Sequence, residues 1–94
     1  METLNLIDLA KAAGGGLRPV PGTGFEVQAL LTPRGETLER ELWLLVLQGE
    51  LLIDLPHGDF RHLRRGDSLR LEAGLKVTLK ITLTPLGETV LLRG

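Results

Sequence analysis

The clearest pattern in the sequence is a strict alternation of apolar and polar residues over positions 75–84. The odd positions carry Leu, Val or Ile, and the even positions carry Lys or Thr. Successive side chains of a β-strand point to opposite faces, so a period of two gives one buried and one solvated face. The sequence therefore predicts a half-buried strand over residues 75–84.

Other short apolar runs, separated by turns rich in Gly and Pro, predict further strands. A turn is expected at residues 33–36, and strands 60–64 and 68–72 are expected to pair around a turn at 65–67. Short strands at this spacing favour an antiparallel barrel or sandwich. The predicted strands span residues 25–32, 37–48, 50–55, 60–64, 68–72, 75–84 and 89–92.

One amphipathic helix is predicted over residues 3–13. Thr3 or Asn5 can cap its start by accepting backbone N–H groups, and the three glycines at 14–16 can end it in a left-handed conformation. A helix this short is marginal alone. We therefore expect it to pack on the outside of the sheet.

Residues 42–47 are apolar at every position. One face of this strand can point into the barrel, and the other needs a cover, because soluble monomers rarely expose large apolar patches. The helix or a second copy of the chain can supply that cover. Trp43, the one tryptophan, fits a pocket wall, an interface or the core. We expect a homodimer.

Composition narrows the classes of partner and compartment. The 94 residues suit a single domain over 1–94. The formal net charge of −1 and the few aromatic residues argue against nucleic-acid binding. No apolar run is long enough for a membrane span, and the N-terminus lacks a basic leader. The absence of cysteine fits a reducing cytoplasm, and the low content of thermolabile residues is typical of thermophiles.

Two stretches resemble motifs of the cupin family, whose members are small double-stranded β-helix barrels. Residues 43–51, WLLVLQGEL, look like the end of the first cupin motif, where a strand meets a glycine turn. Residues 66–74, GDSLRLEAG, look like the start of the second motif, with Glu72 where that motif has proline. The resemblance covers about residues 25–83. It implies an all-β fold, a small antiparallel cupin-like β-barrel (jelly roll) with one short N-terminal helix.

The positions that ligate metal in metal-binding cupins carry other residues here. The resemblance implies two histidines and a glutamate in the first motif and a third histidine in the second, a set that suits iron, manganese, nickel or zinc. Residues 35–42 contain no histidine, the glutamate position falls on Leu42, and the third histidine falls on Val77. Glu41 lies one residue away and would face the other side unless a bulge intervenes. We therefore expect no metal and no cofactor, and no metal-dependent dioxygenase, isomerase or decarboxylase.

Without those ligands, the interior of the barrel is expected to be aliphatic. Such a cavity could hold a small apolar ligand. Its predicted lining is Leu42, Leu44, Ile53, Val77, Leu79 and Ile81.

His57 and His62 are the candidates for a general base or a metal ligand. A turn separates them, so the two rings could approach each other, with Asp59 as a nearby third ligand. The alternative is that His57 is a solvent-exposed turn residue in the sequence PHGD. We favour this second interpretation.

Two charged clusters also have two interpretations. Glu39 and Glu41 share a strand face by the period of two, and paired carboxylates can perform acid–base chemistry; a hydrated strand end is the simpler interpretation. Arg61, Arg64 and Arg65 could bind a phosphate or carboxylate. The interpretation that we favour is that they protect a strand edge from aggregation.

Three functions remain open from the sequence. The one we predict is a metal-free cupin that serves as a small-molecule-binding or structural module, without catalysis. An enzyme acting on a small metabolite through His57, His62, Glu39 or Glu41 is the first alternative. An interaction domain that works through its dimer or edge surface is the second.

Overall fold

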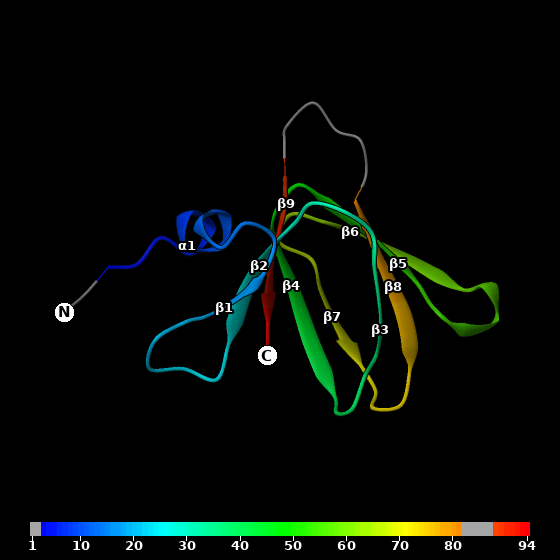
Figure 1. The fold of residues 1–94 in the computed structure, drawn as a ribbon. Coiled ribbons are helices and arrows are strands. Elements are labelled where there is room, and N and C mark those ends of the chain that lie inside the picture. Colours follow the sequence, from blue (N-terminus) through cyan, green and yellow to red (C-terminus); the bar gives the residue numbers. More distant parts are fainter. Residues whose placement is uncertain (1–2, 82–87) are drawn as a thin grey trace.

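Two antiparallel sheets face each other and bury one face each in a common interior (Figure 1). The structure is a computed structural model that describes residues 3–81 and 88–94. The first sheet has five strands, in the order β1 (Leu17–Pro19), β2 (Glu26–Leu30), β9 (Thr89–Arg93), β4 (Leu42–Gln48) and β7 (Ser68–Leu71). The second has four, in the order β3 (Arg34–Thr37), β8 (Lys76–Ile81), β5 (Glu50–Asp54) and β6 (Phe60–Arg64).

The period of two places aliphatic side chains between the sheets, as predicted. On β8, Val77 and Leu79 are buried, whereas Lys76 and Lys80 are exposed. The last three residues of the predicted strand, 82–84, lie outside the described residues. The buried members of this interior are Leu30, Leu38, Leu44, Val46, Leu51, Ile53, Leu63, Leu71, Val77, Leu79 and Leu91.

The helix α1 (Leu6–Ala12) covers part of the outer face of the five-stranded sheet (Figure 1). Of the two expected caps, Asn5 is the one used: its Oδ1 accepts from the backbone N–H groups of Ile7 and Asp8, both at 3.1 Å. The helix is shorter than predicted because Thr3 and Leu4 precede this cap. Its buried contacts form a second apolar cluster, made of Ala10, Val27, Ala29 and Val90. Among the described residues, no helix has the length and apolar character that crossing a bilayer requires.

The predicted long strand over 37–48 is wrong, as is the predicted turn at 33–36. Residues Arg34–Thr37 form β3 in one sheet, and Leu42–Gln48 form β4 in the other. Leu38 continues the pairing of β3 along the residues that directly precede β8. Its N–H donates to Leu75 O at 2.9 Å, and its carbonyl accepts from Gly74 N–H at 2.7 Å. The chain then crosses between the sheets. The polar β3 was mistaken for a turn because an edge strand tolerates polar residues, Pro and Gly.

The predicted pairing of strands 60–64 and 68–72 is also wrong. β6 pairs with β5 and β7 pairs with β4, so the turn between them crosses from one sheet to the other. Two hydrogen bonds hold this crossing to β4: Gly66 N–H donates to Val46 O at 2.8 Å, and Asp67 O accepts from Val46 N–H at 3.0 Å. A local pattern cannot distinguish such a corner from a hairpin, because both need a turn.

Two smaller differences concern the first strands. Residues Leu17–Pro19, which lie outside the predicted strands, pair with β2 as the edge strand β1. β2 is buried on both faces, since α1 covers one face and the second sheet the other. Phe25 and Leu31, which the predicted strand 25–32 includes, lie outside β2 and are exposed. The turn expected at 56–59 is present as a short 3-10 turn, Pro56–Gly58.

Gly49 joins β4 to β5 within the stretch that resembles the first cupin motif. Its φ is +75°, and a Cβ there would lie 3.1 Å from three atoms: the backbone O of Glu88 and the Cα and Oγ1 of Thr89. Thr89 cannot turn aside easily, because its hydroxyl donates to Glu50 O at 2.7 Å. Gly66 has a similar φ of +89° but no atom within 4 Å of an added Cβ.

We predict that Gly49→Ala lowers the free energy of unfolding more than Gly66→Ala does. Both variants meet the left-handed penalty of about 1–2 kcal/mol, and only Gly49→Ala adds crowding, worth about 1–3 kcal/mol. Urea denaturation of the two variants measures the difference. Equal losses would mean that the backbone of Thr89 yields to the new methyl group.

Candidate functional site

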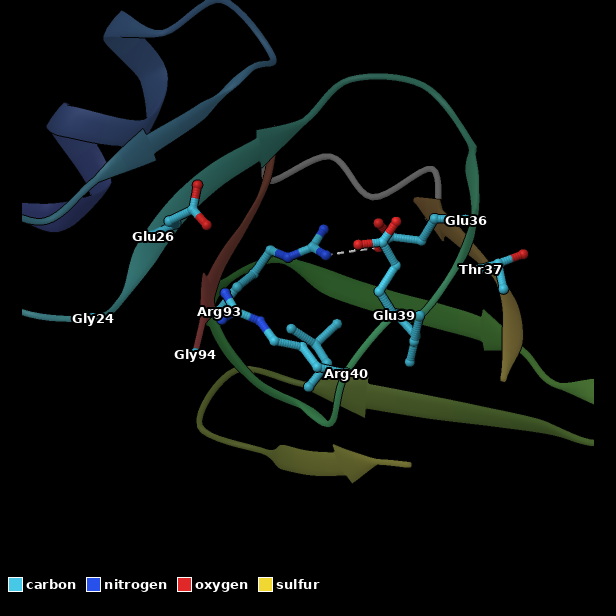
Figure 2. A pocket seen from close by; sticks show the side chains of 10 residues that line it. Gly24, Glu26, Glu36, Thr37, Glu39, Arg40, Arg93 and Gly94 are labelled. Carbon is cyan, nitrogen blue, oxygen red and sulfur yellow. Dashed lines mark ion pairs between the residues drawn. The ribbon is translucent and has the colours of Figure 1, made fainter. Parts of the chain in front are cut away.

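A hollow of about 490 Å³ opens at one end of the interior, where β2, β9 and the crossing between β3 and β4 come together (Figure 2). We call it the polar hollow, because charged residues dominate its lining. The lining residues are Gly24, Glu26, Glu36, Thr37, Leu38, Glu39, Arg40, Leu42, Arg93 and Gly94.

Strand register explains why charged side chains face the interior here. On β9, Leu91 lies in the core between the sheets, so Arg93, two residues later, faces the same way. Paired residues of neighbouring strands share a face, so Gln28, opposite Leu91, also points inward. In the other sheet, Glu36 of β3 is paired with Val77 of β8, whose side chain lies in the core, so Glu36 also points inward.

The three inward polar residues form one connected group. Arg93 Nη2 lies 2.8 Å from Glu36 Oε1, and the side chains concerned are 9% and 22% exposed. Arg93 Nη1 donates to Gln28 Oε1 at 3.3 Å, and Gln28 Nε2 donates weakly to Gly15 O at 3.5 Å. Figure 2 shows the ion pair of Arg93 and Glu36 spanning the hollow from β9 to β3. The group therefore links both sheets and the segment after α1.

Glu36 Oε1 remains unsatisfied within the described part of the chain. It is buried and has no hydrogen-bond partner, because the approach of Arg93 is an ion pair without hydrogen-bond geometry. The guanidinium of Arg93 nevertheless compensates the charge of this carboxylate, because the two atoms are 2.8 Å apart.

Of the predicted acidic pair, Glu39 lines the polar hollow and Glu41 does not. Glu41 is exposed and pairs with Arg70, and it lines a separate pocket with Arg70, Glu72 and Ala73. Leu42, one residue further on, does line the polar hollow. Residues 41 and 42 thus point to different sides, as the sequence indicates. The carboxylates of Glu39 and Glu41 lie on different surfaces.

The predicted histidines lie elsewhere. His57 is exposed in the 3-10 turn, with φ 66° and ψ 27°. His62 is exposed on β6, where its Nε2 lies 3.4 Å from Glu50 Oε2. Asp59, the proposed third ligand, pairs with Arg61 at 2.8 Å. Within residues 3–81 and 88–94, no three His, Cys, Asp or Glu side chains are grouped so that they could hold a metal ion.

The arginine cluster lies at a sheet edge. Arg61 and Arg64 belong to β6, the edge strand of its sheet, and Arg65 begins the turn that follows. Arg64 Nε lies 4.0 Å from Glu50 Oε1. This placement agrees with the protective role that the sequence suggested.

The six residues expected to line an aliphatic cavity belong to the core between the sheets. Four are fully buried there: Leu44, Ile53, Val77 and Leu79. Leu42 and Ile81 pack against them and are partly buried. Leu42 is the member of this set that also lines the polar hollow.

Sequence reasoning missed Gln28 and Arg93, and it placed Glu36 in a turn. Two signals were available: Gln28 interrupts the apolar run of β2, and Arg93 continues the alternation of Leu91. Ending the last predicted strand at residue 92 concealed the second signal. The approach of Arg93 to Glu36 depends on pairing between strands that lie far apart in the sequence.

Solved structures settle the fold. A cupin-2 domain protein from Shewanella frigidimarina matches with a TM-score of 0.75 at 13% identity, over 96% of this chain and 90% of that one. A Rhizobium leguminosarum protein of unknown function gives 0.76 at 16% identity, over 99% and 93%. A cupin-superfamily protein from Desulfitobacterium hafniense gives 0.60 at 18% identity, over 73% and 62%.

The chain has the cupin fold. At these identities the similarity extends to the fold alone. No protein-family model and no curated protein sequence matches the chain. In this cupin fold, the two positions assigned to metal ligands by the resemblance, Leu42 and Val77, carry side chains that cannot ligate a metal.

A double-mutant cycle tests the buried ion pair of Glu36 and Arg93. We predict that Glu36→Gln, which leaves Arg93 buried without its counter-charge, costs about 3 kcal/mol of unfolding free energy. Glu36→Gln with Arg93→Met should cost clearly less than the sum of the two single changes, because no charge is then left unpaired. Urea denaturation measures all three variants.

The exposed pair of Glu41 and Arg70 is the matched control. Glu41→Gln should cost less than about 1 kcal/mol, since water screens exposed ion pairs. Additive effects in the cycle at Glu36 and Arg93 would show that these two side chains do not interact.

Proposed function

We propose that this cupin-fold protein binds a small polar molecule in the polar hollow. The observation that carries the proposal is the charged wall of that hollow, where Arg93 is almost fully buried against Glu36. The volume of about 490 Å³ is within the usual range of small-molecule pockets.

Stability alone is a poor explanation for this wall. A buried ion pair loses the hydration of both charges, and aliphatic residues of similar size usually stabilise a core as well or better. The rest of the interior is in fact aliphatic. A charged group retained where the interior opens into a hollow is better explained by recognition of a ligand.

The same wall favours a polar ligand over the apolar one suggested by the sequence. The aliphatic side chains expected to line a cavity pack against one another, so an apolar guest would have to displace them. The enzyme alternative has less support, because His57 and His62 do not line the hollow and Glu41 is paired with Arg70.

Protein-observed NMR with a library of small polar metabolites tests the proposal. We expect at least one compound to shift the amide signals of Glu26, Glu36 and Arg93. Glu39→Gln should weaken that compound several-fold, because Glu39 lies exposed at the opening. Glu72→Gln, an exposed change outside the hollow, should leave its affinity unchanged. Shifts confined to other surfaces would refute binding in the hollow.

We also propose that the chain self-associates through the part of the five-stranded sheet that α1 leaves open. Trp43 and Phe25 are 37% and 40% exposed, and their ring centroids are 6.3 Å apart. Leu45, two residues along β4 on the same face as Trp43, is partly exposed. An aromatic pair beside an aliphatic strand is typical of an interface centre.

If this face joins two copies, Trp43→Ala should weaken the dimer about tenfold or more, since aromatic anchors contribute about 2 kcal/mol. Analytical ultracentrifugation at micromolar concentrations measures the change. Phe60→Ala is the matched control, because Phe60 is an exposed aromatic residue on the other sheet. A wild-type chain that sediments as a monomer would rule out the dimer.

A further inference from the structure

The polar hollow is open to solvent over about half of its lining. Of the ten described residues that line it, five are exposed: Gly24, Thr37, Glu39, Arg40 and Gly94. Small-molecule sites usually bury about 70–90% of the ligand surface, so a compound in this hollow would lack part of its cover. We infer that a second copy of the chain supplies that cover, and that the hollow is a complete site only in the dimer. This inference rests on the proposed binding function and on the proposed self-association.

The aromatic pair at the centre of the proposed interface adjoins the rim of the hollow. Phe25 lies between two lining residues, Gly24 and Glu26, and its ring fills the space that a side chain at Gly94 would need. Two backbone hydrogen bonds, both 2.9 Å long, join Trp43 to Gly94. Gly94 is thus part of the rim and also lies directly beside both aromatic residues.

The area that a stable dimer needs carries the interface beyond these two rings. Trp43 and Phe25 are 37% and 40% exposed, which for aromatic side chains amounts to less than about 200 Å² in total. A stable interface covers about 800 Å² of each partner, a patch of about 16 Å radius. An interface of that size centred on the pair includes Gly94 and Gly24, because these residues adjoin the rings.

The helix α1 limits the direction in which the interface can extend. It already covers Val27, Ala29 and Val90 on the outer face of β2 and β9. The aromatic pair lies at the other end of these strands, next to Glu26 and Gly94 of the rim. Extension past the pair therefore leads over the end of the sheet where the hollow opens (Figure 2).

Closure by a second copy makes ligand binding and dimer formation stabilise each other. A compound enclosed in the dimer makes contacts that the monomer does not offer, so it binds the dimer more tightly. By linkage, the same compound strengthens the dimer by the same factor. Entry and release then take place while the two copies are apart.

Cysteine labelling tests the closure without any ligand. The chain contains no cysteine, so one introduced thiol reports whether its position is covered. Gly24→Cys lies beside Phe25, and Glu39→Cys lies on the crossing between β3 and β4 (Figure 2). Neither change crowds the fold, because Glu39 is exposed and no described atom lies within 4 Å of a Cβ at Gly24.

We expect each of these thiols to react with iodoacetamide at least tenfold more slowly in the dimer than in the monomer. Each variant is compared with itself, above and below the protein concentration at which sedimentation shows the dimer to separate. The intrinsic reactivity of the thiol therefore cancels.

Two controls accompany the measurement. Lys80→Cys, exposed on the four-stranded sheet, should react at one rate at every concentration. Adding Trp43→Ala to Gly24→Cys or Glu39→Cys should keep labelling fast at every concentration, with the fold checked by the amide spectrum. Slow labelling that persists in these double variants would come from the monomer itself and would refute closure by a second copy.

The remaining outcomes separate closure from the proposals on which it rests. If the dimer protects Gly24→Cys but not Glu39→Cys, or protects neither, closure is refuted while self-association stands. A chain that is monomeric at every concentration refutes both, and binding in the hollow is then decided by the metabolite screen. If both thiols are protected but no metabolite shifts Glu36 or Arg93, closure stands and the binding function is refuted.

Discussion

Burial of the inner faces of two small sheets is the constraint on which the rest of this structure depends. Neither sheet can fold alone, because each exposes a row of aliphatic side chains until the other covers it. Leu44 and Leu91 of one sheet and Ile53 and Leu79 of the other are fully buried in the shared core. Every chain crossing must therefore keep the sheets face to face, and glycine serves this need at Gly49, where an added Cβ would be crowded.

The same constraint produces the polar hollow. Inward positions are fixed by strand register, so a charged residue at such a position has no route to solvent except at the end of the sandwich. Arg93 and Glu36 occupy inward positions close to such an end, one from each sheet. Their attraction offsets part of the lost hydration, and Gln28 takes up one further N–H group of Arg93. The aliphatic core thus ends in a charged wall instead of an apolar opening.

Sequence reasoning succeeded where the signal is local and failed where it depends on distant pairing. The alternation around Val77 and the glycine turn at Gly49 are local, and they were sufficient for an all-β cupin-like fold. The sheet membership of β3, β6 and β7 depends on partners far along the chain, and a turn residue such as Gly66 has the same sequence signature in a hairpin and in a corner. Arg93 could have been placed by extending one strand by one residue, but its proximity to Glu36 could not.

Departure from the metal-binding cupin pattern changes the chemistry of the interior without emptying it of polar groups. Aliphatic residues stand at the two ligand positions considered, Leu42 and Val77, yet Val77 pairs directly with Glu36, which carries charge into the same interior. A metal centre would organise its ligands around one cation, whereas Arg93 and Glu36 present fixed charges of both signs at 2.8 Å. Such an arrangement gives little stability for its cost, because both charges lose their hydration when they are buried. The charged wall is therefore a feature that the packing of the aliphatic core does not require.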